Sequence, residues 1–160
     1  MARIALVSSA GGHLTQILAL ANELAGEQDF LLCVQDFPGV RGMQLEEVGR
    51  IHYAPIYWQY QRPFGVIVSL LASLFMLARV FWKERPDFLI TTGAEIAIPA
   101  LLVGRFLFRR PTLYIESLAR IESPSLTGRI CYHLADRVFV QWPGLLGFYG
   151  PKAEYRGNLL

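Results

Sequence analysis

The chain has 160 residues, which is enough for one domain with a proper hydrophobic core and too few for two ordinary domains. Its 15 Lys and Arg residues against 13 Asp and Glu leave a net charge of only +2, which argues against a broad nucleic-acid-binding field. With 53% hydrophobic residues, 18% charged residues and a mean hydropathy of +0.34, the chain is more apolar than a free globular protein. We therefore expect part of its surface to contact something other than water.

Short apolar runs alternate with longer helical patterns along the whole chain. Strands are predicted at residues 4–7, 30–34, 51–54, 88–91, 112–115 and 138–140, and helices at 14–25, 43–48, 64–84, 96–108 and 126–134. This alternation predicts βαβ units in an α/β fold, a Rossmann-like doubly wound parallel sheet that takes up residues 1–160 as a single domain. Residues 55–63 are predicted to form a loop.

The segment SSAGGHLTQ, residues 8–16, joins the first predicted strand to the first predicted helix. Backbone N–H groups and the positive end of the helix dipole converge on such a turn, so we expect it to bind an anion. The small residues Ser9, Gly11 and Gly12 leave room for a phosphate or diphosphate. The same dipole disfavours a protonated imidazole, which suits His13 to act as a general base. The alternative is that His13 only caps the helix or packs on the sheet.

The turn differs from the other glycine-rich nucleotide motifs. A dinucleotide-binding fingerprint needs a third glycine, which is missing after Gly11 and Gly12. Asp36 nevertheless follows the second strand, where a ribose-binding acid would lie. A P-loop is excluded because no Gly-Lys-Ser/Thr follows the turn. A nicotinamide-dependent oxidoreductase therefore stays as an alternative.

Residues 64–82 form a 19-residue apolar run in which Arg79 is the only charge. A bilayer can be spanned by about 20 such residues. A crossing would put strands of one sheet on opposite sides of the membrane, so we expect a monotopic helix that dips into one leaflet. Residues 65, 69, 72, 73 and 76 share the face expected against the sheet, and the lipid-facing side is expected to carry Phe64, Val68, Leu71, Phe75 and Trp82. The alternative is a helix buried by protein.

Two basic clusters close apolar stretches of the chain. They consist of Arg79, Lys83 and Arg85, and of Arg105, Arg109 and Arg110. We expect them to face anionic lipid headgroups, although cations also favour helix C-termini.

Two cysteines and the start of the chain bear on its compartment. Cys33 and Cys131 lack metal-ligand spacing and are expected to be buried thiols in a reducing compartment. The first three residues run directly into an apolar segment without a signal-peptide cleavage site. The expected location is therefore the cytoplasmic side.

Polar side chains follow two later strands. Gly93 and Glu95 come after the fourth predicted strand, and the fifth is followed by Glu116, Ser117 and Arg120. Ligands of open parallel sheets collect at the carboxyl ends of the strands. A carboxylate there can orient a sugar hydroxyl and a guanidinium can pair with a phosphate, although the two can also form a structural ion pair. We expect no metal, because no carboxylate pair has metal-ligand spacing.

The segments SSAGGHLTQ, TTGAEIAIPA, YIESLARIESPSLTGRICYHLADRVFVQWPGL and YGPKAEYRGNLL together resemble a known family. The chain resembles the membrane-anchoring subunit of the two-chain UDP-N-acetylglucosamine transferase of dolichol-linked oligosaccharide synthesis. It is still more similar to the bacterial relatives of the PssD type in capsule and exopolysaccharide assembly. The resemblance runs nearly end to end and implies the N-terminal, acceptor-side half of a split GT-B glycosyltransferase. The UDP-sugar would be bound mainly by a separate chain.

The resemblance also implies roles for individual residues. MurG-like enzymes carry a similar Gly-Gly-His turn that faces the acceptor diphosphate and the reactive hydroxyl, which makes His13 the expected base, with Glu116 as a second catalytic residue. The residues expected to bind the acceptor and its diphosphate are Ser9, Gly11, Gly12, Gly93, Glu95, Ser117 and Arg120. Contacts with the membrane are expected from Phe64, Leu71, Phe75, Arg79, Trp82 and Lys83, and contacts with the donor-binding chain from Trp142, Pro143, Tyr155 and Asn158.

The implied reaction is inverting transfer of a sugar from a UDP donor to a polyprenyl-diphosphate-linked saccharide at the cytoplasmic face of the inner membrane, without a cofactor held by this chain. Alone, the chain is expected to be inactive. Eukaryotic members have a hydrophobic N-terminal anchor, whereas this sequence starts at its first strand, so attachment is expected to depend on residues 64–82 and the basic clusters. The alternative is a non-catalytic membrane scaffold that recruits and activates the catalytic chain.

Overall fold

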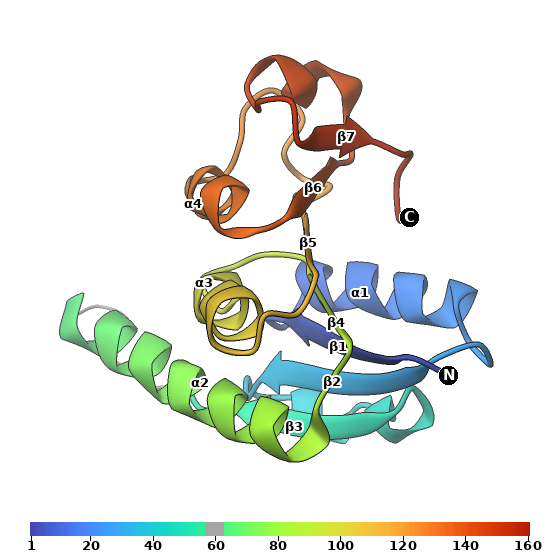
Figure 1. Ribbon diagram of the computed structural model, residues 1–160, viewed down its shortest axis with the longest axis vertical. Coiled ribbons are helices and arrows are strands. Elements are labelled where there is room, and N and C mark those ends of the chain that lie inside the picture. Colours follow the sequence, from blue (N-terminus) through green and yellow to red (C-terminus); the bar gives the residue numbers. More distant parts are fainter. Residues whose placement is uncertain (57–62) are drawn as a thin grey trace.

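A computed structural model describes residues 1–56 and 63–160, with the side chains of residues 63 and 64 left out, so most of the predicted loop at 55–63 and the side chain of Phe64 lie outside the described residues. Seven parallel strands form one sheet in the order β3-β2-β1-β4-β5-β6-β7 (Figure 1). Their bounds are β1 Arg3–Ser8, β2 Asp29–Gln35, β3 Arg50–Ala54, β4 Phe88–Thr91, β5 Thr112–Ile115, β6 Arg137–Val140 and β7 Ala153–Tyr155. The predicted doubly wound parallel sheet is confirmed.

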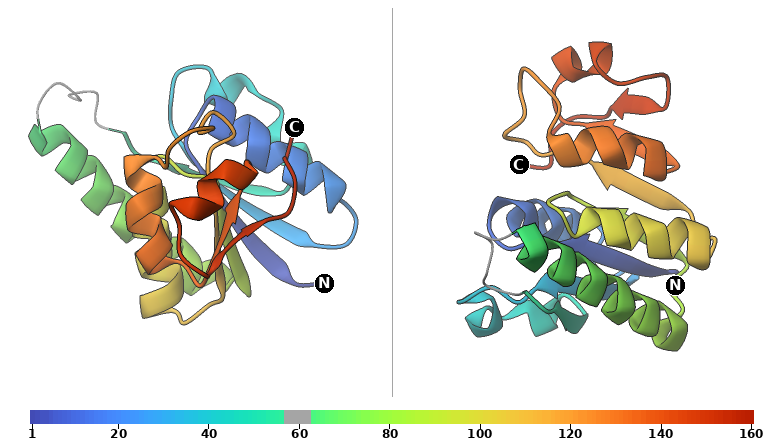
Figure 2. Two further views of the ribbon diagram at one scale, coloured as in Figure 1. Left: turned by 90° about the horizontal axis from the view of Figure 1, so that it is seen from above. Right: turned by 90° about the vertical axis from the view of Figure 1, so that its left-hand side faces the viewer.

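Helices cover both faces of this sheet (Figure 2). The α-helices are α1 Gly12–Glu23, α2 Pro63–Glu84, α3 Ala97–Leu101 and α4 Leu126–Leu134; α3 continues as the π-helix η3 Leu102–Leu107, and short 3₁₀ turns lie at η1 Val40–Gly42, η2 Leu45–Glu47 and η4 Pro143–Gly147. One apolar core lies between the sheet and α2, α3 and α4, and a second lies under α1 and the first two 3₁₀ turns. The inner strands are apolar on both faces because both are covered.

Three elements differ from the prediction. Residues 43–48 do not form an α-helix, because only Leu45–Glu47 are helical there, as a single 3₁₀ turn that anchors Leu45 in the core. A separate 3₁₀ turn at Val40–Gly42 precedes the segment and begins after the left-handed Gly39 (φ 87°). The predicted helix at 96–108 changes to π geometry at residue 102, near Gly104, where a Cβ would lie 2.6 Å from the side chain of Leu89. The short strand β7 was missed, because three residues are too few for an alternating pattern.

Helix α2 lies beside α3 on one face of the sheet (Figures 1 and 2). Gly65, Ser69 and Ser73 are buried, as predicted, whereas Phe75 and Trp82 are each 74% exposed. Among the described residues, Gly65–Glu84 is the one helix long and apolar enough to cross a membrane, with a mean hydropathy of 2.0, and 28% of that stretch is buried. The strands on either side of α2 belong to the same sheet, so the helix does not carry the chain across a membrane.

Both cysteines are buried and free, as the sequence predicts. Burial, with a smaller effect from nearby carboxylates, raises the pKa of the Cys33 and Cys131 thiols to about 12 each. Both thiols are therefore protonated and unreactive at neutral pH, which is typical of structural rather than catalytic cysteines.

Candidate functional site

The sheet has its topological switch point between β1 and β4, the position at which open α/β sheets bind ligands. The chain leaves β1 through the glycine turn into α1 and leaves β4 through Thr92 and Gly93. The two loops are joined by a pair of hydrogen bonds. The His13 ring nitrogen Nδ1 lies 2.6 Å from the carbonyl oxygen of Thr92, and the Thr92 hydroxyl donates to the carbonyl oxygen of His13 at 3.0 Å.

These contacts fix the tautomer of the neutral His13 ring. A carbonyl oxygen can only accept, so Nδ1 carries the hydrogen and the neutral ring presents a lone pair on Nε2. Nε2 forms no hydrogen bond with the residues that the structure describes. Gly93 lies directly beneath the ring, with φ at +109°, and a Cβ there would come within 3.1 Å of the His13 Cε1 atom. Glycine is therefore needed at 93 both for the backbone and for the ring.

The N-terminus of α1 is open to a ligand. The helix begins at Gly12 after Gly11, which has φ at 73° and offers no side-chain cap, and its first turn contains no acidic residue. Gly11 and Gly12 are exposed, and no atom lies within 4 Å of a Cβ placed on either of them. The first N–H groups of the helix are therefore available to an anion.

A cavity of about 440 Å³ lies beside this helix start. Its lining comes from α1, from the loop after β4, from the loop after β5 and from the start of α4: His13, Ala94, Ser117, Ala119, Arg120, Ser125, Leu126 and Thr127. The structure thus brings together His13, Ser117 and Arg120, which the sequence singled out separately. Among the described residues, Arg120 forms no ion pair, so its guanidinium is available to a phosphate.

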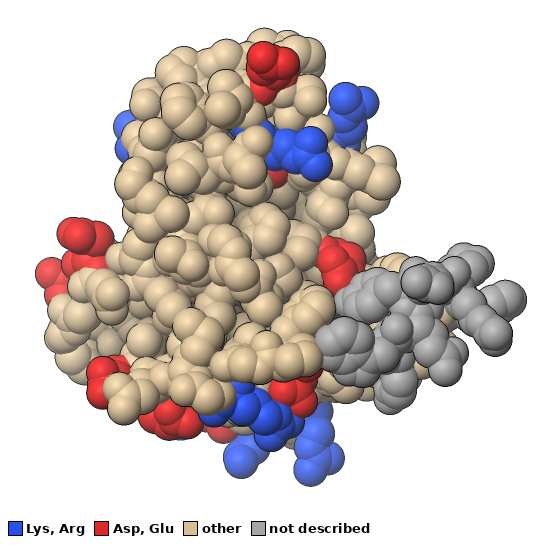
Figure 3. All heavy atoms as spheres, turned by 180° about the vertical axis from the view of Figure 1, so that it is seen from behind, with Lys and Arg blue, Asp and Glu red and all other residues tan. Residues whose placement is uncertain are grey.

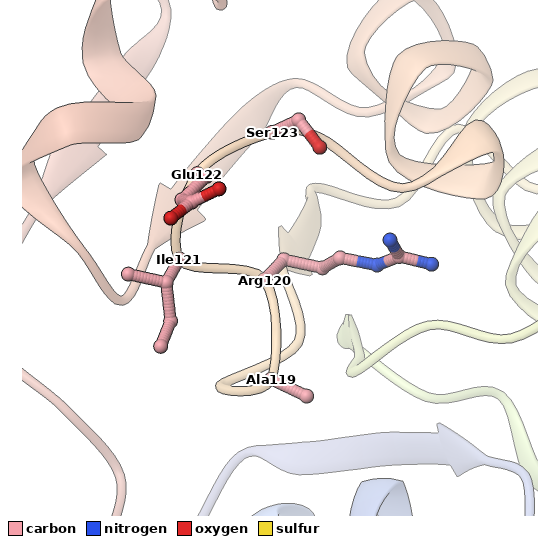
Figure 4. A pocket seen from close by; sticks show the side chains of 5 residues that line it. All are labelled: Ala119, Arg120, Ile121, Glu122 and Ser123. Carbon is pink, nitrogen blue, oxygen red and sulfur yellow. The ribbon is translucent and has the colours of Figure 1, made fainter.

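The loop that carries Arg120 curves around a further hollow of about 300 Å³, lined by residues 119–123. Figure 4 shows the Arg120 side chain extended away from the loop on one side, with Ile121 pointing to the other. Seen from behind relative to Figure 1, the middle of the molecular surface carries few charged side chains (Figure 3). An anion bound in this region would therefore meet few competing carboxylates.

A second cavity, of about 420 Å³, adjoins the first and shares Ala94 with it. It is lined by Ser9, Ala10, Gly11, Gln35, Phe37, Pro38, Ala94 and Glu95. Ser9, Gly11 and Glu95 therefore lie here rather than around Arg120. The Gln35 side chain, which the sequence reading missed, donates to the Glu95 carboxylate at 3.0 Å. Amide, carboxylate and hydroxyl groups can form hydrogen bonds with the hydroxyls of a sugar. An aromatic ring such as that of Phe37 can pack against the face of a sugar ring.

Glu116 lies beneath the cavity rather than in its lining. Its side chain is fully buried, and its carboxylate accepts hydrogen bonds from the hydroxyls of Tyr114, Tyr149 and Ser125 and from the backbone N–H groups of Ser117 and Ser125. Burial and this carboxylate both raise the pKa of the two tyrosines, so both phenols stay protonated and donate. Glu116 thus holds both ends of the segment that carries Ser117 and Arg120.

The residues expected at the partner interface lie at the β7 end of the sheet. Pro143, Tyr155 and Asn158 are exposed. Trp142 is half-buried, and its indole N–H donates to the carbonyl oxygen of Leu118 at 2.7 Å. Trp142 is therefore tied to the cavity loop and offers only part of its surface to another chain.

The residues expected at the membrane all lie on α2. Leu71, Phe75, Arg79, Trp82 and Lys83 are exposed. An apolar groove of about 480 Å³ runs between α2 and η3, lined by Leu74, Phe75, Ala78, Leu102, Val103, Phe106 and Leu107. Arg105 departs from the expected basic cluster. It turns inward to the Asp136 carboxylate at 3.0 Å and to the carbonyl oxygens of residues 134 and 135, which end α4.

Two other site types find little support in the described part of the chain. No group of three or more His, Cys, Asp or Glu residues there is placed to hold a metal ion. Asp36 was the residue that left a dinucleotide-binding site as an alternative. Both of its carboxylate oxygens accept hydrogen bonds from Arg41, at 2.7 and 2.6 Å.

The sheet order, the glycine turn at the switch point and the covering helices define a Rossmann-like half of a GT-B fold. MurG from Acinetobacter baumannii superposes with a TM-score of 0.80 at 18% identity, covering 99% of this chain and 46% of that one. UDP-GlcNAc 2-epimerase from Neisseria meningitidis, solved with UDP-GlcNAc bound, gives a TM-score of 0.69 at 16% identity, covering 98% of this chain and 47% of that one. The chain spans about half the length of these structures, and at such identities the likeness shows the fold alone.

Sequence comparison identifies the family. Residues 59–159 match the family described as "Oligosaccharide biosynthesis protein Alg14 like". Proteins named UDP-N-acetylglucosamine transferase subunit ALG14 are 30% identical in Mus musculus, covering 99% of this chain and 83% of the mouse protein, and 32% identical in Schizosaccharomyces pombe, covering 92% and 78%. The chain therefore belongs to the Alg14-like family of glycosyltransferase subunits, as its motifs indicated.

A single-chain transferase is also similar. The protein of Verminephrobacter eiseniae named UDP-N-acetylglucosamine--N-acetylmuramyl-(pentapeptide) pyrophosphoryl-undecaprenol N-acetylglucosamine transferase is 30% identical over 139 residues. The matched region covers 86% of this chain and 33% of that enzyme. The similarity is thus confined to about a third of that longer protein.

Proposed function

We propose that this chain is the acceptor-binding and membrane-anchoring subunit of a two-chain inverting glycosyltransferase. The enzyme moves a sugar from a UDP donor to a polyprenyl-diphosphate-linked saccharide in bacterial polysaccharide biosynthesis, in capsule or exopolysaccharide assembly. One observation carries the proposal: in a chain of the Alg14-like family, the imidazole of His13 and the guanidinium of Arg120 line one cavity, and Gly11 at the open N-terminus of α1 lines the cavity that adjoins it.

The two adjoining cavities divide the proposed acceptor between them. The diphosphate is bound by the first N–H groups of α1, with Arg120 as its counter-charge. The saccharide extends toward the second cavity, where the Glu95 carboxylate, oriented by Gln35, accepts from its hydroxyls and Phe37 packs on its ring face.

His13 is the proposed general base. Its Nε2 atom takes the proton from the attacking acceptor hydroxyl as the oxygen forms a bond to the anomeric carbon of the donor and the bond to UDP breaks. Attack from the face opposite UDP inverts the anomeric centre. The partner chain binds the UDP-sugar and stabilises the negative charge that develops on UDP. No cofactor of this chain takes part in the proposed step.

The partner is a separate donor-binding chain that docks on the β7 end of the sheet, where Pro143, Tyr155 and Asn158 are exposed. The proposed location of the pair is the cytoplasmic face of the inner membrane.

Acceptor binding by this chain alone tests the first half of the proposal. We expect a short-chain polyprenyl diphosphate saccharide to bind in isothermal titration calorimetry, and a UDP-sugar not to bind. Arg120→Ala should weaken acceptor binding by about tenfold or more, because a charge-assisted contact with phosphate is lost. The matched control is Arg137→Ala, an exposed arginine at the start of β6, which is the end of the strand opposite to the proposed site. Equal affinities for both variants and the wild type would contradict the assignment of Arg120.

We further propose that α2 and the apolar groove beside it rest in one leaflet of the membrane. The double variant Phe75→Glu and Trp82→Glu should lose at least about tenfold in affinity for phosphatidylglycerol vesicles. The reason is that two hydrated carboxylates replace aromatic side chains that would insert into the leaflet. Sedimentation with vesicles measures this. The control is Phe148→Glu, 61% exposed on another element, which should bind as the wild type does.

The contrary outcome is also specific. If the wild type does not bind vesicles and the double variant has a different oligomeric state in light scattering, the membrane assignment is wrong. The exposed face of α2 is then covered by protein, which is the alternative given for this helix from its sequence.

A non-catalytic scaffold is the second candidate function. The burial of Glu116 favours it, because one of the two predicted catalytic groups lies outside the cavity. In that case the chain only presents the acceptor, and all proton transfer falls to the partner chain.

A further inference from the structure

Two buried glutamines lie behind the proposed acceptor cavity. Gln16 is one turn into α1 and is 4% exposed, and Gln141 follows β6 and is 1% exposed. The side-chain N–H of Gln141 donates to the side-chain oxygen of Gln16, so the two amides form one unit. Neither residue belongs to the cavity lining.

Backbone groups fix the orientation of both amides. Gln16 donates from Nε2 to the carbonyl oxygen of Gly12 at 3.0 Å and accepts on Oε1 from the N–H of Leu118 at 3.1 Å. Gln141 donates from Nε2 to the carbonyl oxygen of Glu116 at 2.8 Å and accepts on Oε1 from the N–H of Leu159 at 2.9 Å. A carbonyl only accepts and a backbone N–H only donates, so neither amide can flip without losing partners.

This pair of amides, the glutamine relay, connects three parts of the molecule. Gly12 belongs to the start of α1, and His13 in that helix start forms one wall of the cavity. Glu116 and Leu118 flank Ser117 in the loop that leads to Arg120, which is the other wall. Leu159 belongs to the C-terminal segment beyond β7. The relay therefore joins both walls of the cavity to the end of the chain.

We propose that Gln16 and Gln141 are positioning residues that hold the two walls of the acceptor cavity at a fixed separation, and that the Leu159 N–H is the third member of this device. The placement of the C-terminal segment then sets the affinity of the cavity for the acceptor. The inference rests on the proposed acceptor function. Loss of one member leaves buried polar groups without a hydrogen-bond partner. The remaining hydrogen bonds of the network are therefore weakened together rather than one at a time.

Leu159→Pro tests the third member, because proline has no N–H to donate to Gln141. Leu159→Ala is the matched control: it keeps the N–H and removes only the side chain, which packs against the core. In the two-chain enzyme at saturating partner, we expect Leu159→Pro to raise the acceptor KM about tenfold. The kcat at saturating acceptor and the donor KM should stay within about twofold. Leu159→Ala should leave all three values within about twofold.

Gln141→Met completes a double-mutant cycle. Alone it should also raise the acceptor KM about tenfold, and adding Leu159→Pro to it should change nothing further, because both act through the same amide. Fully additive effects would overturn the inference. So would variants that lower Tm by several degrees while the acceptor KM stays at the wild-type value, since that is the behaviour of a purely structural network.

Hydrogen exchange of this chain gives a readout that needs no catalysis. We expect the amides of residues 15 and 16 and of residues 117–120, which are hydrogen-bonded, to lose protection together in Leu159→Pro and to keep it in Leu159→Ala. If the wild-type pair transfers no sugar, the proposed function fails, and the exchange result still decides whether the relay couples the two walls. Loss confined to residues near 159 would overturn the coupling.

Discussion

Replacing His13 by alanine should lower the kcat of sugar transfer in the assembled enzyme by about 10²- to 10⁴-fold, the usual contribution of a positioned general base. The ring is held by the Thr92 carbonyl through Nδ1, which leaves Nε2 as the proton acceptor. Folding should survive, because His13 is only half-buried and lies at the rim of a cavity. The measurement is kcat at saturating acceptor and donor, with Tm as the check on folding. His133→Ala, an exposed histidine on α4, is the matched control and should keep full activity.

The same experiment separates a base from a scaffold. If His13→Ala keeps a near-normal kcat and raises only the acceptor KM, His13 binds the acceptor without taking its proton. That result would favour the scaffold function over the catalytic one.

Replacing Glu116 by leucine should lower the free energy of unfolding by about 3–5 kcal/mol, as expected when the centre of a buried polar network is removed. The variant leaves the hydroxyls of Tyr114, Tyr149 and Ser125 without their common acceptor in an interior that water does not reach. Urea denaturation measures the loss. Glu122→Leu, an exposed glutamate of the same segment, is the control and should change the free energy of unfolding by less than about 0.5 kcal/mol.

Glu116→Gln distinguishes the two roles considered for this residue. It keeps the size of the side chain but turns an NH₂ group toward groups that donate, so stability and activity should fall together. If stability is unchanged and kcat alone collapses, Glu116 takes part in the reaction, as the family resemblance implies.

The sequence predicted most of the fold because the periodicities are strong. Six of the seven strands are runs of apolar residues, and each lies within about one residue of its predicted bounds. The helix at 63–84 was equally clear, and Val68, Leu71 and Phe75 are exposed where the pattern placed them. The segment 43–48 was mistaken for a helix because a single anchored apolar residue, Leu45, produces the same local pattern as a helix face.

The site was only partly readable from the sequence. His13 and Arg120 could be found because they follow strand ends, where topology gathers ligand-binding groups. Gln16, Gln35 and Gln141 gave no signal, since a neutral amide carries no charge pattern and its role depends on hydrogen-bonding groups up to 125 residues away. The burial of Glu116 depends on Tyr149, 33 residues further along the chain, and no local spacing reveals such a contact.

The most direct test of the two-chain function is a UDP-release assay with a panel of UDP-sugars and a short-chain polyprenyl diphosphate saccharide. It compares this chain alone, the donor-binding chain alone and the mixture, each in phosphatidylglycerol vesicles. We predict release of UDP, with the sugar recovered on the lipid-linked saccharide, only from the mixture. Acceptor-dependent release of UDP by either chain alone, or no transfer by the mixture with any donor in the panel, would contradict the assignment of this chain as the acceptor half of the enzyme.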